Sequence, residues 1–235
     1  MVGARTTSGT PARLLGRVIE GAKPAPSLGF VHPCCPTPRK DPPTGDGWLH
    51  EIKHDGYRAQ AHLTDGARIF TLRGYDWAAR MPTIASAVSS LPVKSVILDG
   101  ELVAVDLKGQ PAFYELPTAV SAKNTRVKAR LLYYAFDLLY LDGIDLRGAP
   151  LIDRKRLLET LLDNARGLQF IKYVDHLEGL CAVVLEHACK LSLEGIVSKR
   201  ADAPYRSGKR PEWIKIKCPA WREANKERFE KMSKI

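Results

Sequence analysis

Residues 57–73 read YRAQAHLTDGARIFTLR, and this stretch sets the class of the fold. Its first half places apolar side chains at every second position from Tyr57 to Leu63, with Arg58 and other polar residues between them. Such alternation indicates a β-strand with one buried face. Asp65 and Gly66 then favour a tight turn into a second strand. The stretch therefore predicts a β-hairpin, and with it an antiparallel sheet.

Later residues repeat the strand pattern and add helices. Segments rich in Val, Ile, Leu and Tyr predict strands in residues 95–106, 130–141, 168–174, 195–200 and 212–217. Helical spacing of apolar side chains predicts helices over residues 77–90, 152–164 and 179–191. Antiparallel sheets flanked by helices are expected, which is an α+β fold class.

The two ends and the segment before the hairpin lack this periodicity. Residues 1–28 are basic and rich in Gly, Ala, Pro and Ser, which favours a disordered extension, with a transit peptide as the alternative. Prolines in residues 33–47 predict an irregular lead-in, because they remove backbone donors. Residues 219–235 predict a short amphipathic helix. One catalytic domain is thus expected over residues 29–218.

Charge and composition narrow the classes of partner. The chain has 36 Lys and Arg against 26 Asp and Glu, a net charge of +10, which favours a polyanion without separating DNA from RNA. No apolar run is long enough to span a bilayer, so no membrane is expected. Five cysteines without a CxxC pair, and six scattered histidines, favour neither a disulfide framework nor zinc, and suit a reducing cytoplasm.

The segment EIKHDGYR, residues 51–58, places Lys53 at the end of a strand, just before an Asp-Gly bend. A lysine becomes a nucleophile when its pKa, ordinarily about 10.4, is lowered by desolvation or by a nearby positive charge. Arg58 or a bound metal ion would supply that charge. An ordinary lysine beside a turn is the alternative for this segment alone.

Two further segments supply groups that suit a nucleotide. In LDGEL, residues 98–102, Glu101 projects from an apolar strand and needs a ribose hydroxyl, a metal ion or a basic side chain as its partner. In YYAFD, residues 133–137, Phe136 is suited either to stacking on a base or to the core. Asp137 interrupts the apolar pattern of the same strand.

The last two segments suit phosphates and their counterions. LEGIVSKR, residues 193–200, carries Glu194 before a glycine and a buried strand. Together Glu101 and Glu194 are enough to help hold Mg²⁺ or Mn²⁺. EWIKIK, residues 212–217, alternates apolar residues with Lys215 and Lys217, as expected of a strand face that meets phosphates. A solvated strand edge also carries lysines.

In this order KHDGYR, LDGEL, YYAFD, LEGIVSK and WIKIK resemble the nucleotidyltransferase motifs of ATP-dependent DNA ligases, RNA ligases and capping enzymes, over about residues 28–218. The sequence around these motifs, including PYRSGKRPEWIKIK, is most similar to that of the bacterial ligases that include the ligase module of end-joining enzymes. The resemblance implies a nucleotidyltransferase, ATP-grasp-like ligase core. No OB-fold domain is expected after Lys217, as in compact ligase-like proteins. A five-stranded barrel needs about 25 residues in strands alone, which is more than the sequence has after Lys217.

The resemblance also implies roles for single residues. Lys53 would form a covalent bond to AMP, with Glu51 and Phe136 flanking the adenine, while Asp55 and Asp99 would shape strand ends. The remaining implied contacts are ribose or phosphate for Arg58, Arg73 and Glu101, phosphates for Lys215 and Lys217, and metal for Glu101 and Glu194.

The function implied is that of a DNA ligase that uses ATP and Mg²⁺ or Mn²⁺. AMP on Lys53 would pass to the 5′-phosphate of nicked or broken double-stranded DNA, and a 3′-hydroxyl would displace it during repair. A monomer in the bacterial cytoplasm, associated with the nucleoid and aided by a separate DNA-end-binding protein, is expected. Two alternatives stay open: an RNA ligase or capping-type nucleotidyltransferase, and a non-catalytic module that binds nucleic acid.

Overall fold

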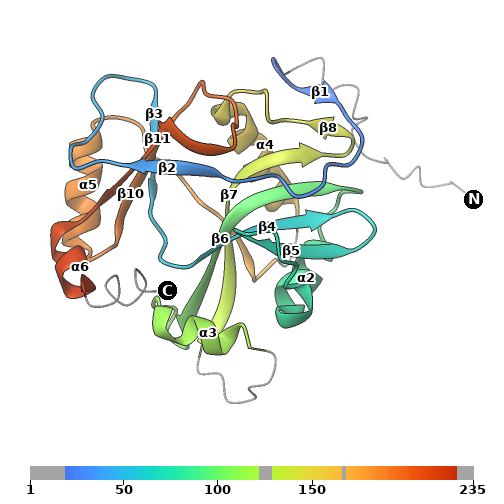
Figure 1. Cartoon of the computed structure of the whole chain (residues 1–235), viewed down its shortest axis with the longest axis horizontal. Helices are drawn as coiled ribbons and strands as arrows, with labels where there is room; N and C mark the ends of the chain where they lie inside the picture. The colour runs from blue at the N-terminus through green and yellow to red at the C-terminus, as the bar shows by residue number, and fades with distance from the viewer. Residues whose placement is uncertain (1–18, 122–128, 166–167, 227–235) are drawn as a thin grey trace, which may run out of the picture.

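Two β-sheets form the framework of the computed structural model, which describes residues 19–121, 129–165 and 168–226 (Figure 1). The larger sheet has the strand order β1-β8-β7-β6-β4-β5, with β9 paired to β7. All its pairs are antiparallel except β7 with β9. Its strands are β1 (Lys23–Pro24), β4 (Tyr57–Leu63), β5 (Ala67–Thr71), β6 (Val96–Asp106), β7 (Ala129–Leu141), β8 (Ile144–Asp145) and β9 (Ile171–Tyr173).

The smaller sheet has the order β2-β11-β10-β3, and its β2 and β11 run parallel. It lies beside the larger sheet, at the left of Figure 1. Its strands are β2 (Cys34–Pro38), β3 (Trp48–Ile52), β10 (Gly195–Arg200) and β11 (Gly208–Lys217).

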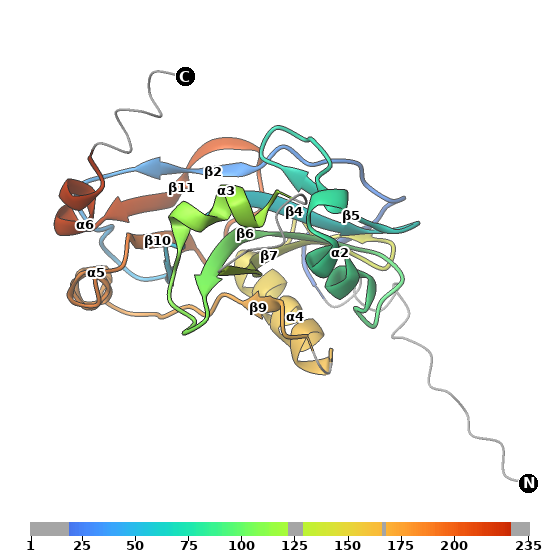
Figure 2. The same cartoon turned by 90° about the horizontal axis from the view of Figure 1, so that it is seen from below.

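Helices cover the outer faces of the two sheets (Figure 2). The helix α2 packs on β4 and β5, α4 on β7 and β9, and α5 on β10 and β3. None of the helices in the described ranges is long and apolar enough to cross a membrane. The helices are α2 (Pro82–Ser89), α3 (Leu116–Ala119), α4 (Leu151–Asn164), α5 (Cys181–Lys190) and α6 (Pro219–Ala224), with 3-10 turns η1 (Ala78–Arg80) and η2 (Phe113–Glu115).

The predicted hairpin and the α+β class are confirmed. Strands β4 and β5 pair from Ala59–Thr71 to Leu63–Ala67, around the predicted turn. The polar face of β4 is nevertheless buried as well. The Gln60 side chain accepts a hydrogen bond from the backbone N–H of Val31 and donates one to its C=O, at 3.2 and 2.6 Å. The segment before the hairpin therefore covers the face that alternation alone assigns to solvent.

The expectation of an irregular lead-in is wrong for Cys34–Pro38, which form β2. This strand lies at the edge of the smaller sheet, where a proline without a backbone donor is tolerated. Strand β1 pairs with β8 inside the expected extension 1–28, of which residues 1–18 lie outside the described residues. The helix expected over 219–235 is present as Pro219–Ala224, and residues 227–235 also lie outside the described ranges.

A buried ion pair fixes α4 against β7 of the larger sheet. Asp137, the polar residue inside the apolar strand β7, accepts two hydrogen bonds from the Arg154 guanidinium, at 2.7 and 2.9 Å. Both side chains are fully buried. Asp137 thus holds α4 against the sheet, and this contact accounts for the break in the apolar pattern.

A disulfide joins Cys189, in α5, to Cys218, just after β11. The cysteine pattern predicted no disulfide framework and a reducing cytoplasm, and for this pair that expectation is wrong. The two cysteines are 29 residues apart, but the sheet brings their Cα atoms to 5.3 Å. Spacing along the chain cannot reveal such a pair. Among the described residues the thiols of Cys34, Cys35 and Cys181 are free.

Candidate active site

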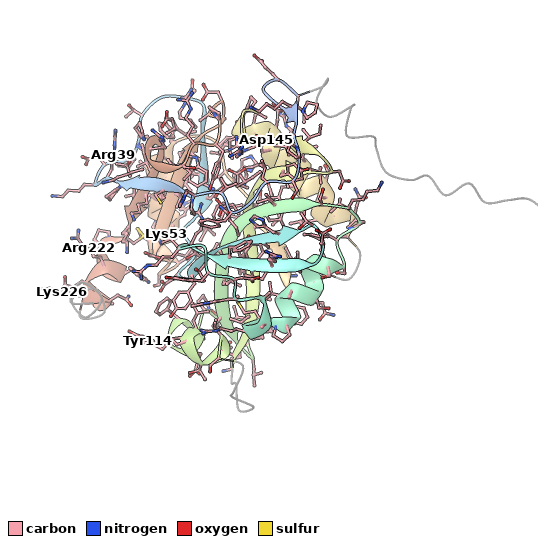
Figure 3. The ribbon with its side chains drawn as sticks, turned by 45° about the vertical axis from the view of Figure 1, so that its right-hand side comes forward. Arg39, Lys53, Tyr114, Asp145, Arg222 and Lys226 are labelled. Carbon is pink, nitrogen blue, oxygen red and sulfur yellow. A yellow bond between two sulfur atoms is a disulfide. The ribbon has the colours of Figure 1, made fainter. Side chains whose placement is uncertain are left out.

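Lys53 lies at the junction of the two sheets, directly after β3 (Figure 3). Its backbone N–H donates to the C=O of Gly195, at 2.9 Å, which ties it to the start of β10. The following bend passes close to β6: a Cβ atom on Gly56 would lie 2.1 Å from the backbone oxygen of Leu102. Only glycine allows this approach. The bend therefore holds Lys53 beside Glu101 of β6.

A small cavity of about 80 Å³, called here the Lys53 pocket, opens at this junction. Its walls come from both sheets and from the bend after β3. Five residues that the sequence analysis selected line it: Glu51, Lys53, Arg58, Glu101 and Phe136.

Glu194 connects Lys53 to the last strand. One carboxylate oxygen accepts from the Lys53 ammonium at 2.7 Å, and the other lies 2.8 Å from the Lys217 ammonium. The Glu194 side chain is 3% exposed, whereas that of Lys53 is 20% exposed. Burial, and after it the charges of Lys53 and Lys217, lower the pKa of nearby Lys215. These contacts bring the lysines of β11 close to Lys53.

Glu51 lines the pocket and is paired with two lysines, Lys155 and Lys199, that were not predicted as site residues. Its carboxylate accepts a hydrogen bond from Lys155 at 2.7 Å and another from Lys199. All three side chains are almost completely buried. Burial, together with the charge of Lys155, lowers the pKa of Lys199 to about 8, although Glu51 opposes the shift. Glu51 is thus fixed in place before any ligand arrives.

One signal for Lys155 was present in the sequence. Positions 154 and 155 fall on the same helical face as the buried Leu151, Leu158 and Leu161. Cations on the apolar face of a helix require buried partners. The helix over residues 152–164 was predicted from its apolar spacing alone, without these cations.

Arg58 is held over an aromatic wall. Asp99 accepts two hydrogen bonds from its guanidinium, at 2.7 and 2.6 Å, and a third from the Tyr205 hydroxyl. The guanidinium carbon lies 4.4 Å from the centre of the Phe136 ring, and the Lys199 ammonium lies 4.1 Å from it. Phe136 therefore lines the pocket with two cations over its ring, and Asp99 orients Arg58.

The carboxylate of Glu194 pairs with the Lys53 ammonium, and that of Glu101 interacts with it electrostatically. Burial raises the pKa of Glu101 to about 7, with Lys53 and Arg58 opposing and Glu194 adding to the shift. A carboxylate that is costly to ionise in a buried position gains a partner when a cation binds. No group of three or more metal-binding side chains occurs in the part of the chain that the structure describes. Two carboxylates nevertheless suit Mg²⁺, which keeps water and phosphate oxygens as its other ligands.

Arg73 stands apart from the Lys53 pocket. It lies in the exposed turn after β5 and does not line the Lys53 pocket. His54, which was not selected, does line it. Its ring stacks on Tyr134 with a centroid distance of 4.1 Å, and burial lowers its pKa to about 4. His54 is therefore a neutral wall of the pocket.

Residues 41–217 match the model of a protein family described as the ATP dependent DNA ligase domain. The chain belongs to this family. It is 37% identical over 216 residues to the multifunctional non-homologous end joining protein LigD of Pseudomonas aeruginosa. That alignment covers 92% of this chain and 25% of the relative, so the chain spans about a quarter of that protein's length.

Solved structures of ligases share the fold of this ligase domain. The ligase domain of LigD from M. tuberculosis is 30% identical, with a TM-score of 0.65 over 78% of this chain and 60% of that one. A mycobacterial DNA ligase D solved with ATP and MES is 31% identical, with a TM-score of 0.62 over 77% of this chain and 60% of that one. These neighbours support the mixed α+β nucleotidyltransferase fold of ligases. They give no support to the ATP-grasp comparison drawn from the sequence.

Proposed function

We propose that this ligase domain transfers AMP from ATP to Lys53 and then to the 5′-phosphate of nicked or broken double-stranded DNA. The observation that carries the proposal is the position of Lys53. Its ammonium lies at the rim of the Lys53 pocket, within 2.7 Å of Glu194 and beside the lysines of β11. A nucleophile, fixed cations and paired carboxylates are what transfer of a nucleotidyl group needs.

In the first step the neutral Lys53 amine attacks the α-phosphorus of ATP. A P–N bond forms, the bond from the α-phosphorus to the bridging oxygen breaks, and pyrophosphate leaves with the electron pair. Glu194 already accepts a hydrogen bond from Lys53, so it is placed to hold the proton that the amine loses. Lys215 and Lys217 offset the charge that develops on the phosphates.

In the later steps the AMP passes from Lys53 to a DNA 5′-phosphate, and a 3′-hydroxyl then displaces it. Breaks in double-stranded DNA are proposed as the substrate because the LigD relative is named for non-homologous end joining. A separate DNA-end-binding protein is proposed as the partner for the same reason.

Glu51 and Phe136 would hold the adenine at the floor of the pocket, with Arg58 and Glu101 near the ribose. Glu101 and Glu194 would hold Mg²⁺ or Mn²⁺, which supplies neutralisation of phosphate charge when bound. The raised pKa of Glu101 supports this assignment, since a cation favours the ionised carboxylate. Arg73, outside the pocket, is proposed to meet the substrate only beyond the adenosine.

Intact mass spectrometry of the protein with ATP and Mg²⁺ tests the proposal. We expect a gain of one AMP in the native chain and none in Lys53→Ala. Lys172→Ala, a change at an exposed lysine in β9, is the matched control and should gain AMP normally. An adduct that persists in Lys53→Ala would refute the assignment of the nucleophile. An adduct formed with GTP alone would favour a capping-type enzyme instead.

A further inference from the structure

A second and larger cavity, of about 870 Å³, lies beside the Lys53 pocket. It is called here the basic cleft. Three elements supply its walls: the segment after β2, the end of β11, and α6 with the residue that follows it. Glu223 is the carboxylate among its described lining residues. The cations that line it are Arg39, Lys40, Lys215, Lys217, Arg222 and Lys226.

The basic cleft begins at the nucleophile. Lys217 and Lys53 share the carboxylate of Glu194, at 2.8 and 2.7 Å. In Figure 3, Arg39, Arg222 and Lys226 lie on the same edge of the molecule, outside Lys53. An anion that extends outward from Lys53 therefore meets these cations next.

The walls of the cleft are anchored to the fold. The backbone N–H of Arg39 donates to the C=O of Lys215, at 3.0 Å, and so holds Arg39 against β11. The helix α6 follows Cys218, which is joined to α5 by the disulfide and donates to the C=O of Glu194, at 2.9 Å. Trp221 of α6 packs against the apolar layer under α5. Arg222 is thus carried by a fixed element.

We propose that the basic cleft binds the β- and γ-phosphates of ATP, and the pyrophosphate formed from them, through Arg39, Arg222 and Lys226. This inference rests on the proposed function, because it takes Lys53 as the group that attacks the α-phosphate. It adds three residues, from the segment after β2 and from the region of α6, that the five motifs do not contain.

Phosphates of a DNA backbone are the competing ligand. A duplex carries its charges along a line, with one charge per about 1.7 Å of helix axis. The cations here converge on one cavity from three elements instead. That arrangement suits a compact anion with several charges, and the volume leaves room for a hydrated pyrophosphate to depart.

The test compares two double variants with the same loss of charge. Arg222→Ala/Lys226→Ala removes two cations from the basic cleft. The control, Arg156→Ala/Lys172→Ala, removes one arginine from α4 and one lysine from β9, both exposed and outside the cleft. For each protein the rate of Lys53 adenylation is measured against ATP concentration, and removal of AMP from the adduct is measured against pyrophosphate concentration.

We expect Arg222→Ala/Lys226→Ala to raise the half-saturating concentrations of ATP and pyrophosphate about tenfold or more, with AMP binding changed less than about twofold, because only the outer phosphates lose partners. Arg39→Ala should shift both in the same direction, and the control variant should shift neither. Unchanged half-saturation for both ligands would overturn the inference. So would a loss confined to DNA binding and sealing, which would assign the cleft to DNA.

Failure of the proposed function would look different. If the native chain forms no adduct with ATP, calorimetric titration with inorganic pyrophosphate still examines the cleft directly. Binding that weakens in Arg222→Ala/Lys226→Ala but not in the control would uphold the site for a diphosphate. Absence of pyrophosphate binding to the native chain would overturn it.

Discussion

The Lys53 pocket and the basic cleft adjoin at Glu194, yet they hold their charges in opposite ways. At the pocket, Glu51, Lys155 and Lys199 are buried, and both lysines donate hydrogen bonds to the Glu51 carboxylate. In the cleft, Arg39 and Lys226 are exposed. Buried charges must be paired to be tolerated, and such pairs fix geometry. Exposed cations cost little and stay available for a mobile anion. The difference suggests that the pocket recognises shape, whereas the cleft recognises charge.

The largest effect is expected from breaking the buried network. Glu51→Ala leaves the ammonium groups of Lys155 and Lys199 buried without their carboxylate. Loss of one partner of a buried pair typically costs about 3–5 kcal/mol. We expect the free energy of unfolding, measured by urea denaturation, to fall by about that amount.

The matched change in the cleft is Glu223→Ala. Glu223 lies 3.8 Å from the Lys226 ammonium, and both side chains are more than half exposed. Exposed pairs contribute about 0–1 kcal/mol, so the free energy of unfolding should change by less than about 1 kcal/mol. Equal losses for Glu51→Ala and Glu223→Ala would contradict the contrast between the two regions.

A smaller effect is expected from the titration of Lys199. Its folded pKa, about 8, lies below its ordinary value of 10.5, so the unfolded chain binds more protons between these values. The contribution of Lys199 to the free energy of unfolding is therefore unfavourable at pH 8 and below, and the free energy of unfolding recovers as the pH rises towards 10.5. The recovery should be about 2–3 kcal/mol for a shift of this size.

Lys199→Met isolates that contribution, since methionine keeps an apolar side chain of similar length without the charge. Thermal or urea unfolding of the native chain and of Lys199→Met is compared from pH 7 to 10. The free energy of unfolding of the native chain should increase relative to that of Lys199→Met as the pH rises. A difference that stays constant over this range would show that Lys199 is not the buried cation that the structure indicates.

Sequence reasoning reached the strands and the motif residues because both depend on local patterns. Alternation located β4, and KHDGYR and LDGEL located Lys53 at the end of a strand and Glu101 within one. Those two residues, with Glu51, Arg58 and Phe136, do line one pocket. The match of motif order to a known family supplied what spacing alone could not.

The features that were missed depend on contacts between distant segments. Strand β2 exists because β11 offers it a partner, and no local pattern in a run of prolines reports that. Lys155 enters the site because α4 packs across the junction of the two sheets and reaches Glu51. Cys189 and Cys218 meet for the same kind of reason. Each of these needs the three-dimensional pairing before the chemistry can be recognised.

The smallest effect expected is a difference in salt dependence between the two regions. Raising NaCl from 50 to 300 mM shortens the Debye length from about 14 to about 6 Å. Exposed charges in the cleft are screened by this change, whereas the buried groups of the pocket are screened much less.

The native chain is titrated with α,β-methylene-ATP, whose α–β bridge cannot be cleaved, and with AMP. We expect the affinity for the ATP analogue to fall about fivefold and that for AMP by less than about twofold, because the outer phosphates alone depend on the cleft. In Arg222→Ala/Lys226→Ala the two ligands should respond to salt alike. Equal responses in the native chain would mean that both regions bind through screened charges, and that the buried pairs around Glu51 do not set the pocket apart.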